Sequence, residues 1–278
     1  MKLRDLTHYE NIQYNLKSLP YYEQIIKSKA NFYISGGYVV ALLFASRKEN
    51  LIIEPGFYDD IDFFFYKEDD YKILNDFFYK KTLEDPSKIC CMSTTDRATT
   101  YHVLGENDFN YKIQLIQKEF GPPHTVFQNY DIVNCCVAYS FADNEIAYKP
   151  VALSRTLDKE IDIFSDYLLN EEHPDFVKNL VLFSFRLNKY SERYSLTLSN
   201  SLFNRLMKLL IKYKDLEISQ EVTRIAGWYG NRTVSFTDKT NVWQFYKNIL
   251  YKNNTYTDYL DKFYQSIDPG NSNSENPF

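Results

Sequence analysis

The sequence lacks the features that mark a membrane or secreted protein. Its longest apolar runs are about ten residues, short of the roughly 20 that a membrane-spanning helix requires. Its first residues contain no apolar region of the kind found in a signal peptide. We therefore expect a soluble, cytoplasmic protein that has no membrane partner.

The sequence also lacks an excess of positive charge. Its 32 lysines and arginines are outnumbered by 37 aspartates and glutamates, and the formal net charge is −5. Because the basic residues are scattered among acidic ones, no electrostatic footprint for duplex DNA is visible. This argues against a long nucleic-acid interface and leaves room for a short one.

Cysteine is scarce, and its spacing does not suit a metal. The four cysteines form two adjacent pairs, Cys90-Cys91 and Cys135-Cys136, each in an apolar stretch typical of a strand. Neighbouring residues on a strand point to opposite faces, so neither pair is a ready disulfide or chelate. The C-x-x-C spacing typical of zinc sites is absent, and we expect no zinc.

What the sequence does contain is enough apolar material for a substantial core. Its 278 residues are 44% apolar, which suits one large or two ordinary domains. The first informative stretch is a short apolar strand, 32–34, that runs into Gly36 and Gly37 and then into an apolar helix-like segment. Backbone amides at such a helix start can hold an anion. Ser35 could donate to a phosphate there, or it could cap the helix.

The second informative stretch is Asp60-Ile61-Asp62. Strand alternation sends both carboxylates to one face and Ile61 to the other. The two acids, about 7 Å apart along a strand, can share divalent metals. Without a cation they would repel each other, so the pattern favours Mg²⁺.

A glycine pair that opens a helix, followed by Asp-x-Asp on the next strand, resembles the signature of the nucleotidyltransferase superfamily, typified by polymerase beta and the CCA-adding tRNA nucleotidyltransferases. The resemblance implies that Gly36 and Gly37 approach the triphosphate of an NTP such as ATP. It also implies that Asp60 and Asp62 hold two Mg²⁺ ions. The 22 residues between Gly37 and Asp60 exceed the usual gap, so 47–57 would be an inserted loop. Each motif also has a plain alternative, close packing for the glycines and a turn or solvated strand end for the acids.

Two positions depart from the family pattern. The strand that resembles the third acidic strand carries Gln114 where the family has a carboxylate, which puts the general-base role in doubt. Gln114 could still orient the acceptor or a water, or it could be an ordinary strand residue. A later block resembles the Arg-Arg-Asp block of tRNA nucleotidyltransferases at Asp131, but Asn129 and Tyr130 replace the arginines. Asp131 could approach the metals, fix the sugar and base of the nucleotide, or cap a turn.

The C-terminal part has apolar residues at helical spacing and few strand patterns. Within it, Arg186, Lys189 and Arg193 fall on one helical side. This stripe could grip phosphates, with Arg155 reaching from the domain junction, or it could be a solvated face.

We therefore predict an α/β (α+β) fold. A nucleotidyltransferase-like core with a mixed sheet and helices would span 1–150, a helical domain 151–266 that closes over the nucleotide, and a disordered tail 267–278. Besides the motif strands, strands are expected over 88–93, 99–104 and 110–117, a hairpin over 133–139 and 146–148, and helices over 6–30, 67–78, 158–169, 175–187, 200–214 and 242–263.

The function that the resemblance implies is Mg²⁺-dependent transfer of a nucleoside monophosphate from an NTP to a hydroxyl, for example at an RNA or tRNA 3′ end. The base-selecting motif of CCA-adding enzymes is not recognisable, so tRNA end repair does not follow. One alternative is a transferase of the same fold that modifies a protein or small molecule. Another is an inactive scaffold that keeps the fold and binds a partner.

Overall fold

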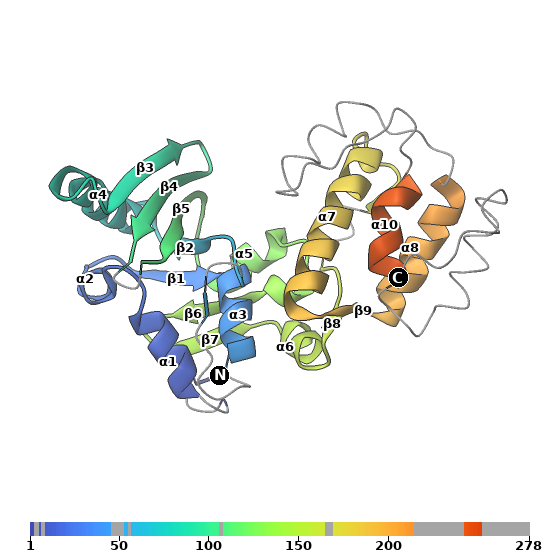
Figure 1. The fold of residues 1–278 in the computed structure, drawn as a ribbon, viewed down its shortest axis with the longest axis horizontal. Helices are drawn as coiled ribbons and strands as arrows, with labels where there is room; N and C mark the ends of the chain where they lie inside the picture. Colours follow the sequence, from blue (N-terminus) through green and yellow to red (C-terminus); the bar gives the residue numbers. More distant parts are fainter. Residues whose placement is uncertain are drawn as a thin grey trace. The chain divides into compact units, whose positions relative to one another are not determined.

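The chain divides into two compact units, 1–158 and 159–278 (Figure 1). The structure is a computed structural model that describes residues 1–2, 6, 9–45, 53–54, 57–105, 108–164, 169–213 and 242–251. The first unit includes a helix after residue 150, which the division by sequence assigned to the helical domain. The expected tail 267–278, most of the expected inserted loop and the end of the last expected helix lie outside the described residues.

The first unit is built on a seven-stranded mixed sheet with the order β3-β4-β5-β2-β1-β6-β7. Among these pairs only β2 and β5 run parallel, and the other neighbours are antiparallel. The expected mixed sheet is confirmed. Its strands are β1 (Phe32–Ser35), β2 (Ile61–Phe65), β3 (Ile89–Thr94), β4 (Ala98–Leu104), β5 (Asn110–Phe120), β6 (Val137–Ser140) and β7 (Glu145–Tyr148).

Helices cover the sheet face that carries the apolar side chains of β2, β4 and β5. The Tyr101 hydroxyl of β4 donates to Asn75 Oδ1 of α4 (Glu68–Glu84) at 2.9 Å, and the Tyr101 ring stacks on Phe78 at 5.2 Å between centroids. The Tyr111 hydroxyl of β5 donates to the carbonyl of Ser18, just after α1. The helices of this unit are α1 (Tyr9–Lys17), α2 (Tyr22–Ile26), α3 (Gly37–Ala45), α4 (Glu68–Glu84), α5 (Pro123–Val126) and α6 (Pro150–Leu157).

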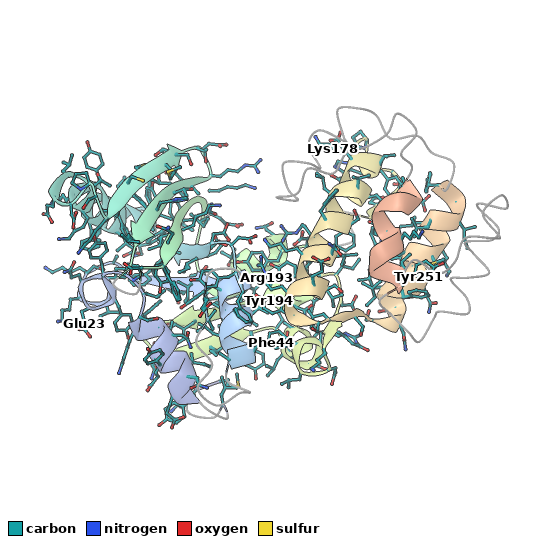
Figure 2. All side chains as sticks on the ribbon, in the orientation of Figure 1. Glu23, Phe44, Lys178, Arg193, Tyr194 and Tyr251 are labelled. Atoms are coloured by element: carbon teal, nitrogen blue, oxygen red, sulfur yellow. The ribbon has the colours of Figure 1, made fainter. Side chains whose placement is uncertain are left out.

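Helix α3 is apolar on all sides, as a helix enclosed within a domain must be. Of its nine residues, all described, Gly37 and Phe44 are partly exposed and the other seven are buried. Figure 2 labels Phe44 on this helix. It packs against α1 and against β1, β2 and β6. This enclosure fixes the position of its N-terminus, which follows directly from β1.

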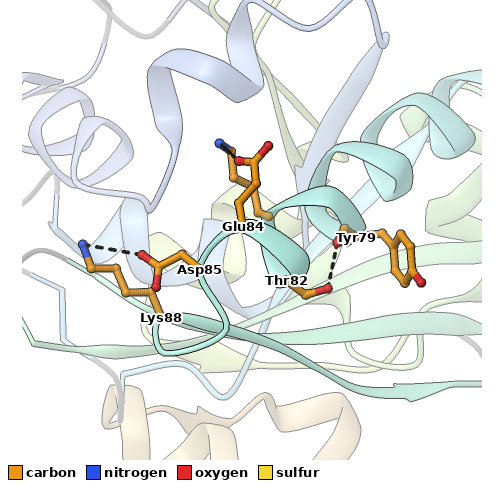
Figure 3. A network of polar contacts seen from close by, with 6 residues as sticks. Tyr79, Thr82, Glu84, Asp85 and Lys88 are labelled. Carbon is orange, nitrogen blue, oxygen red and sulfur yellow. Dashed lines mark hydrogen bonds and ion pairs between the residues drawn. The ribbon is translucent and has the colours of Figure 1, made fainter.

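The end of α4 is closed by short-range polar contacts (Figure 3). Lys81 pairs with Glu84 at 2.6 Å and Lys88 with Asp85 at 4.0 Å, while the Asp85 N–H donates to the Lys81 carbonyl at 2.9 Å. Because most of these side chains are exposed, each ion pair adds little to stability. Their effect is local, at the turn that leads from α4 into β3.

Two sequence-based element predictions are wrong. The alternation over 133–139 predicts a strand, but residues 133–135 form the 3-10 helix η3 (Val133–Cys135) and the strand begins at Val137. All three residues of η3 and all four of the following strand are buried, so the alternating apolar residues there do not mark the two faces of a strand. The helix expected over 158–169 is also absent from the described part of that range, where Glu160 and Ile161 form the strand β8.

All four cysteines, each in the described part of the chain, are free thiols.

The described residues of the second unit are mainly helical, as expected. The Tyr246 hydroxyl of α10 donates to the Leu180 carbonyl of α7, which ties these two helices together. A short parallel pair, β8 with β9, precedes and follows α7. Among the residues that the structure describes, no helix combines the length and apolarity needed to cross a membrane. The elements are β8 (Glu160–Ile161), α7 (Phe176–Tyr194), β9 (Thr197–Leu198), α8 (Asn200–Tyr213) and α10 (Val242–Tyr251).

Candidate active site

The glycine turn joins β1 to α3. Gly36 has a φ of 82°, a left-handed conformation that glycine adopts without strain. The first bond of α3 runs from the Val40 N–H to the Gly36 carbonyl at 3.1 Å, so the amides of Tyr38 and Val39 precede the helical pattern. Amides in this position, at the positive end of a helix dipole, favour an anion.

Asp62 faces this turn because of the strand register. In the sheet, Asp62 of β2 lies opposite Ser35 of β1 and opposite Gln114 of β5. Residues paired in this way project to the same face. A Cβ placed on Gly36 would lie 3.6 Å from Asp62 Oδ2, so the carboxylate stands beside the glycine turn. The structure thus brings Gly36, Ser35 and Asp62 together from two strands.

Tyr130 lies beside the same glycine turn, and sequence reasoning did not select it as a site residue. Its hydroxyl donates to Ser35 Oγ at 2.9 Å, and Ser35 Oγ donates to the Val137 carbonyl at 2.7 Å. The Tyr130 hydroxyl would also lie 3.8 Å from a Cβ on Gly36. Burial raises the pKa of Tyr130 well above its ordinary value, the bond with Ser35 lowers it, and the nearby Asp62 carboxylate raises it further. Tyr130 is therefore a neutral donor that holds the turn.

Asp60 has a different neighbour. It stands immediately before β2, and its carboxylate lies 3.5 Å from the Lys112 ammonium of β5. The side chains of Asp60 and Lys112 are 29% and 38% exposed, so the pair is partly screened by water. Sequence reasoning did not select Lys112, although the alternation that placed Gln114 on this face places Lys112 there as well.

Gln114 and Asp131 occupy distinct surroundings. Gln114, opposite Asp62, donates from Nε2 to Thr100 Oγ1 of β4 at 3.5 Å. Asp131 accepts a 2.8 Å bond at Oδ1 from the N–H of Ile132, so it shapes the turn before η3. It also lies near Cys136, whose pKa is raised to about 12, chiefly by burial. A role of Asp131 toward metal or nucleotide stays a prediction.

The predicted basic residues lie on two helices in different units. Arg155 is in α6 of the first unit, and Arg186 and Lys189 are in α7 of the second. All three side chains are partly buried, as is Arg193, so the stripe is not a fully solvated face. Their contact with an NTP stays a prediction.

The donor chemistry of Asp60, Asp62 and Gln114 suits Mg²⁺, and a metal site here stays a prediction. Asp62 and Asp60 offer the hard carboxylate oxygens that Mg²⁺ prefers, and Gln114 adds a neutral amide on the same face. The missing Cβ of Gly36 leaves space beside Asp62 Oδ2. In the described residues no group of three or more histidines, cysteines or acids gathers around a point.

Two solved structures have a fold similar to that of this chain. The chain is similar to a Thermotoga maritima CCA-adding enzyme in complex with tRNA, with 9% identity and a TM-score of 0.52 over 90% of this chain and 55% of that one. It is also similar to a CCA-adding enzyme in complex with CTP, with 10% identity and a TM-score of 0.50 over 92% and 54%. The chain therefore spans about half the length of these enzymes. At such identity the likeness establishes the fold, and the resemblance to the nucleotidyltransferase superfamily is confirmed at that level.

No curated protein matches the chain. A family model does match, over residues 7–159, and it describes the Gabija anti-defense 2 family protein. The matched stretch is more than half of the chain and nearly coincides with the first unit, 1–158, which holds the glycine turn, Asp60 and Asp62. By this match, the chain belongs to the Gabija anti-defense 2 family.

Proposed function

We propose that this protein is a Mg²⁺-dependent nucleotidyltransferase that moves a nucleoside monophosphate from an NTP to a hydroxyl acceptor. The observation that carries the proposal is the Asp62 carboxylate standing 3.6 Å from the position of a Cβ on Gly36. A carboxylate and a helix N-terminus lie next to each other at this site. The carboxylate is suited to the metal ion of a metal-bound triphosphate, and the helix N-terminus to its phosphates. The fold shared with CCA-adding enzymes supports the same class.

The residues of the candidate site have separate roles in the proposal. The amides at the start of α3 bind the β- and γ-phosphates, and Gly36 lets these phosphates approach the backbone. Tyr130 and Ser35 hold the turn in place through their hydrogen bonds. Asp62 and Asp60 hold Mg²⁺, which when bound neutralises phosphate charge and lowers the pKa of the attacking hydroxyl.

In the proposed reaction, the acceptor oxygen forms a bond to the α-phosphorus and the bond from that phosphorus to the bridging oxygen breaks. Pyrophosphate leaves with the electron pair, and the hydroxyl proton is lost to solvent. Because Gln114 carries no charge, it orients the acceptor or a water and does not act as a base. The basic side chains Arg155, Arg186 and Lys189 are the proposed contacts of the triphosphate.

The acceptor is proposed in two forms. The neighbours are CCA-adding enzymes, one with tRNA and one with CTP, which favours an RNA 3′ end. The family description names anti-defense, which favours a protein or small molecule of a defence system as the acceptor. The net charge of −5 suits an enzyme without a long RNA surface, and we place the activity in counter-defence.

The test is incubation with Mg²⁺, each labelled NTP, and either total RNA or a cell lysate. We expect label in RNA, protein or a small product, and a loss of more than about 100-fold when Asp60 and Asp62 are both changed to Asn. The matched control is Asp69→Asn, an exposed acid of α4 with 89% of its side chain accessible. Transfer that survives the double substitution would refute the site.

An inactive binding scaffold is the second candidate, and two observations favour it. Gln114 stands where the family pattern has an acid, and Asp60 is already paired with Lys112. A scaffold predicts no label in any fraction and no NTP-dependent rise in melting temperature. The same experiment therefore separates the two candidates.

A further inference from the structure

The two carboxylates of the candidate site have different neighbours. Asp60 faces the Lys112 ammonium at 3.5 Å, and Asp62 stands opposite Gln114 in the sheet and beside the glycine turn. Lys112 and Gln114 are neighbours on one face of β5, since 111, 113 and 115 are buried and 112 and 114 are partly exposed. A single strand thus supplies both partners.

Lys112 reduces the negative charge that the site presents to cations. The three acids of the family pattern would carry a charge of −3, which would favour two divalent ions together with a triphosphate. Here Asp60 and Asp62 carry −2 and Lys112 adds +1, so these three side chains together carry −1. A lysine ammonium is a compact charge on a flexible stem that can exchange a carboxylate for a phosphate. With 38% of its side chain exposed, Lys112 has access to solvent and to an incoming ligand.

We propose that Lys112 is a built-in cation of this site. It takes the place of one metal ion, so the site binds one divalent cation, and it moves from Asp60 to the phosphates of the nucleotide when that cation and the nucleotide bind. This inference rests on the proposed function and deepens it, because the superfamily resemblance implies two metal ions. Lys112 is then a positioning residue for the carboxylate and a contact of the substrate.

The proposal predicts effects of opposite sign for Lys112→Met. Without nucleotide, Asp60 loses a competing charge, so affinity for Mn²⁺ as a probe rises about threefold to tenfold. The affinity for a non-hydrolysable ATP analogue falls about tenfold, because one charged contact to phosphate is lost. A purely structural role for Lys112 would lower both affinities together.

The experiment uses the full chain and measures free Mn²⁺ by electron paramagnetic resonance and analogue binding by calorimetry. The wild type should bind one Mn²⁺ per chain, Lys112→Arg should behave like the wild type, and Lys118→Met, an exposed lysine on the same strand, should change neither affinity. Circular dichroism verifies that each variant is folded.

Three results would overturn the inference. Two Mn²⁺ ions bound to the wild type would exclude the replacement of a metal by lysine. A fall, or no change, in the Mn²⁺ affinity of folded Lys112→Met would exclude competition for Asp60 while leaving the proposed function intact. Mn²⁺ binding that survives the change of both acids to Asn would refute the proposed function itself, and with it the role of Lys112.

Discussion

At the scale of single residues, Gly36 links backbone conformation to chemistry. Its φ of 82° lies in the left-handed region, and its missing side chain leaves Asp62 Oδ2 and the Tyr130 hydroxyl next to the turn. A side chain at this position would be strained by the backbone and would also occupy the space where a phosphate is proposed to bind. The backbone strain and the loss of phosphate binding can be measured separately.

We expect Gly36→Ala to destabilise the first unit by about 1–2 kcal/mol, because alanine pays a steric cost in the left-handed region. We also expect it to weaken binding of the ATP analogue. Gly121→Ala is the matched control, since Gly121 also has a positive φ, of 132°, and its nearest contacts are with Thr125. Denaturant unfolding and calorimetry together should show that both variants are destabilised and that Gly36→Ala alone loses nucleotide affinity. Equal nucleotide affinity in the two variants would contradict the phosphate turn.

Tyr130 shows which residues escape a reading of local patterns. It lies 95 positions after Ser35, and its hydrogen bond to Ser35 exists only because the segment after α5 folds back over β1. The sequence marks Tyr130 as the residue in place of a family arginine, without indicating what it contacts. Its buried, neutral hydroxyl supports the backbone of the site and does not carry the charge that an arginine would bring.

At the scale of elements, register decides the composition of the site. The antiparallel pair β1–β2 and the parallel pair β2–β5 set Ser35, Asp62 and Gln114 in one row. A shift of β2 by one residue would turn Asp62 to the apolar face and Ile61 to the polar face. The buried Ile61 and Phe63, both about 1% exposed or less, therefore fix where Asp62 points.

The row formed by Ser35, Asp62 and Gln114 leads to a prediction for the variant Gln114→Glu. The new carboxylate would stand opposite Asp62, and like charges on paired positions repel unless a cation lies between them. We expect the variant to melt at a lower temperature than the wild type with a chelator present. We expect a larger rise in melting temperature on adding Mg²⁺, measured by differential scanning fluorimetry.

The control for this variant is Gln117→Glu, on the same strand and away from the paired row, where Nε2 of Gln117 bonds the Thr95 carbonyl. It adds the same charge and should show the wild-type response to Mg²⁺. An equal response of Gln114→Glu and Gln117→Glu would mean that no cation approaches Asp62.

At the scale of the whole molecule, the core relies on buried tyrosines. Burial raises the pKa of seven of them above the ordinary value, and six of the seven hydroxyls also donate a hydrogen bond, all but that of Tyr58. In the folded state these phenols keep their protons at pH values where the unfolded chain releases them. The seven residues are Tyr33, Tyr38, Tyr58, Tyr101, Tyr130, Tyr139 and Tyr246.

Stability should therefore be lost at alkaline pH. Because the folded-state pKa is raised, the contribution of these groups is complete below the unfolded value of about 10 and falls as the pH rises above it, by about 1 kcal/mol per pH unit for each phenol. Urea unfolding at pH about 8 and about 11, followed by circular dichroism, should show a lower midpoint at the higher pH, and tyrosinate absorbance at pH about 11 should rise as the chain unfolds. Equal midpoints would mean that these phenols ionise in the folded protein.

The sequence indicated much of the first unit because its signals are local. The glycine pair, the apolar run of α3, the acidic start of α4 and the alternation of β5 each specify an element through neighbours within a few residues. The mistaken strand at 133–135 and the mistaken helix after 158 arose where short apolar spacings are compatible with more than one element. Tertiary packing selects among such alternatives.

By itself, the sequence determined the type of fold, the glycine turn and the face of β2 on which Asp62 lies, because these depend on periodicity and on residue chemistry. Only the tertiary structure decided which side chains meet there. Tyr130 reaches Ser35, and Lys112 reaches Asp60 across 52 residues, because the sheet order sets β5 beside β2 and β6 beside β1. Contacts between distant segments depend on strand order and register, which no local pattern of residues encodes.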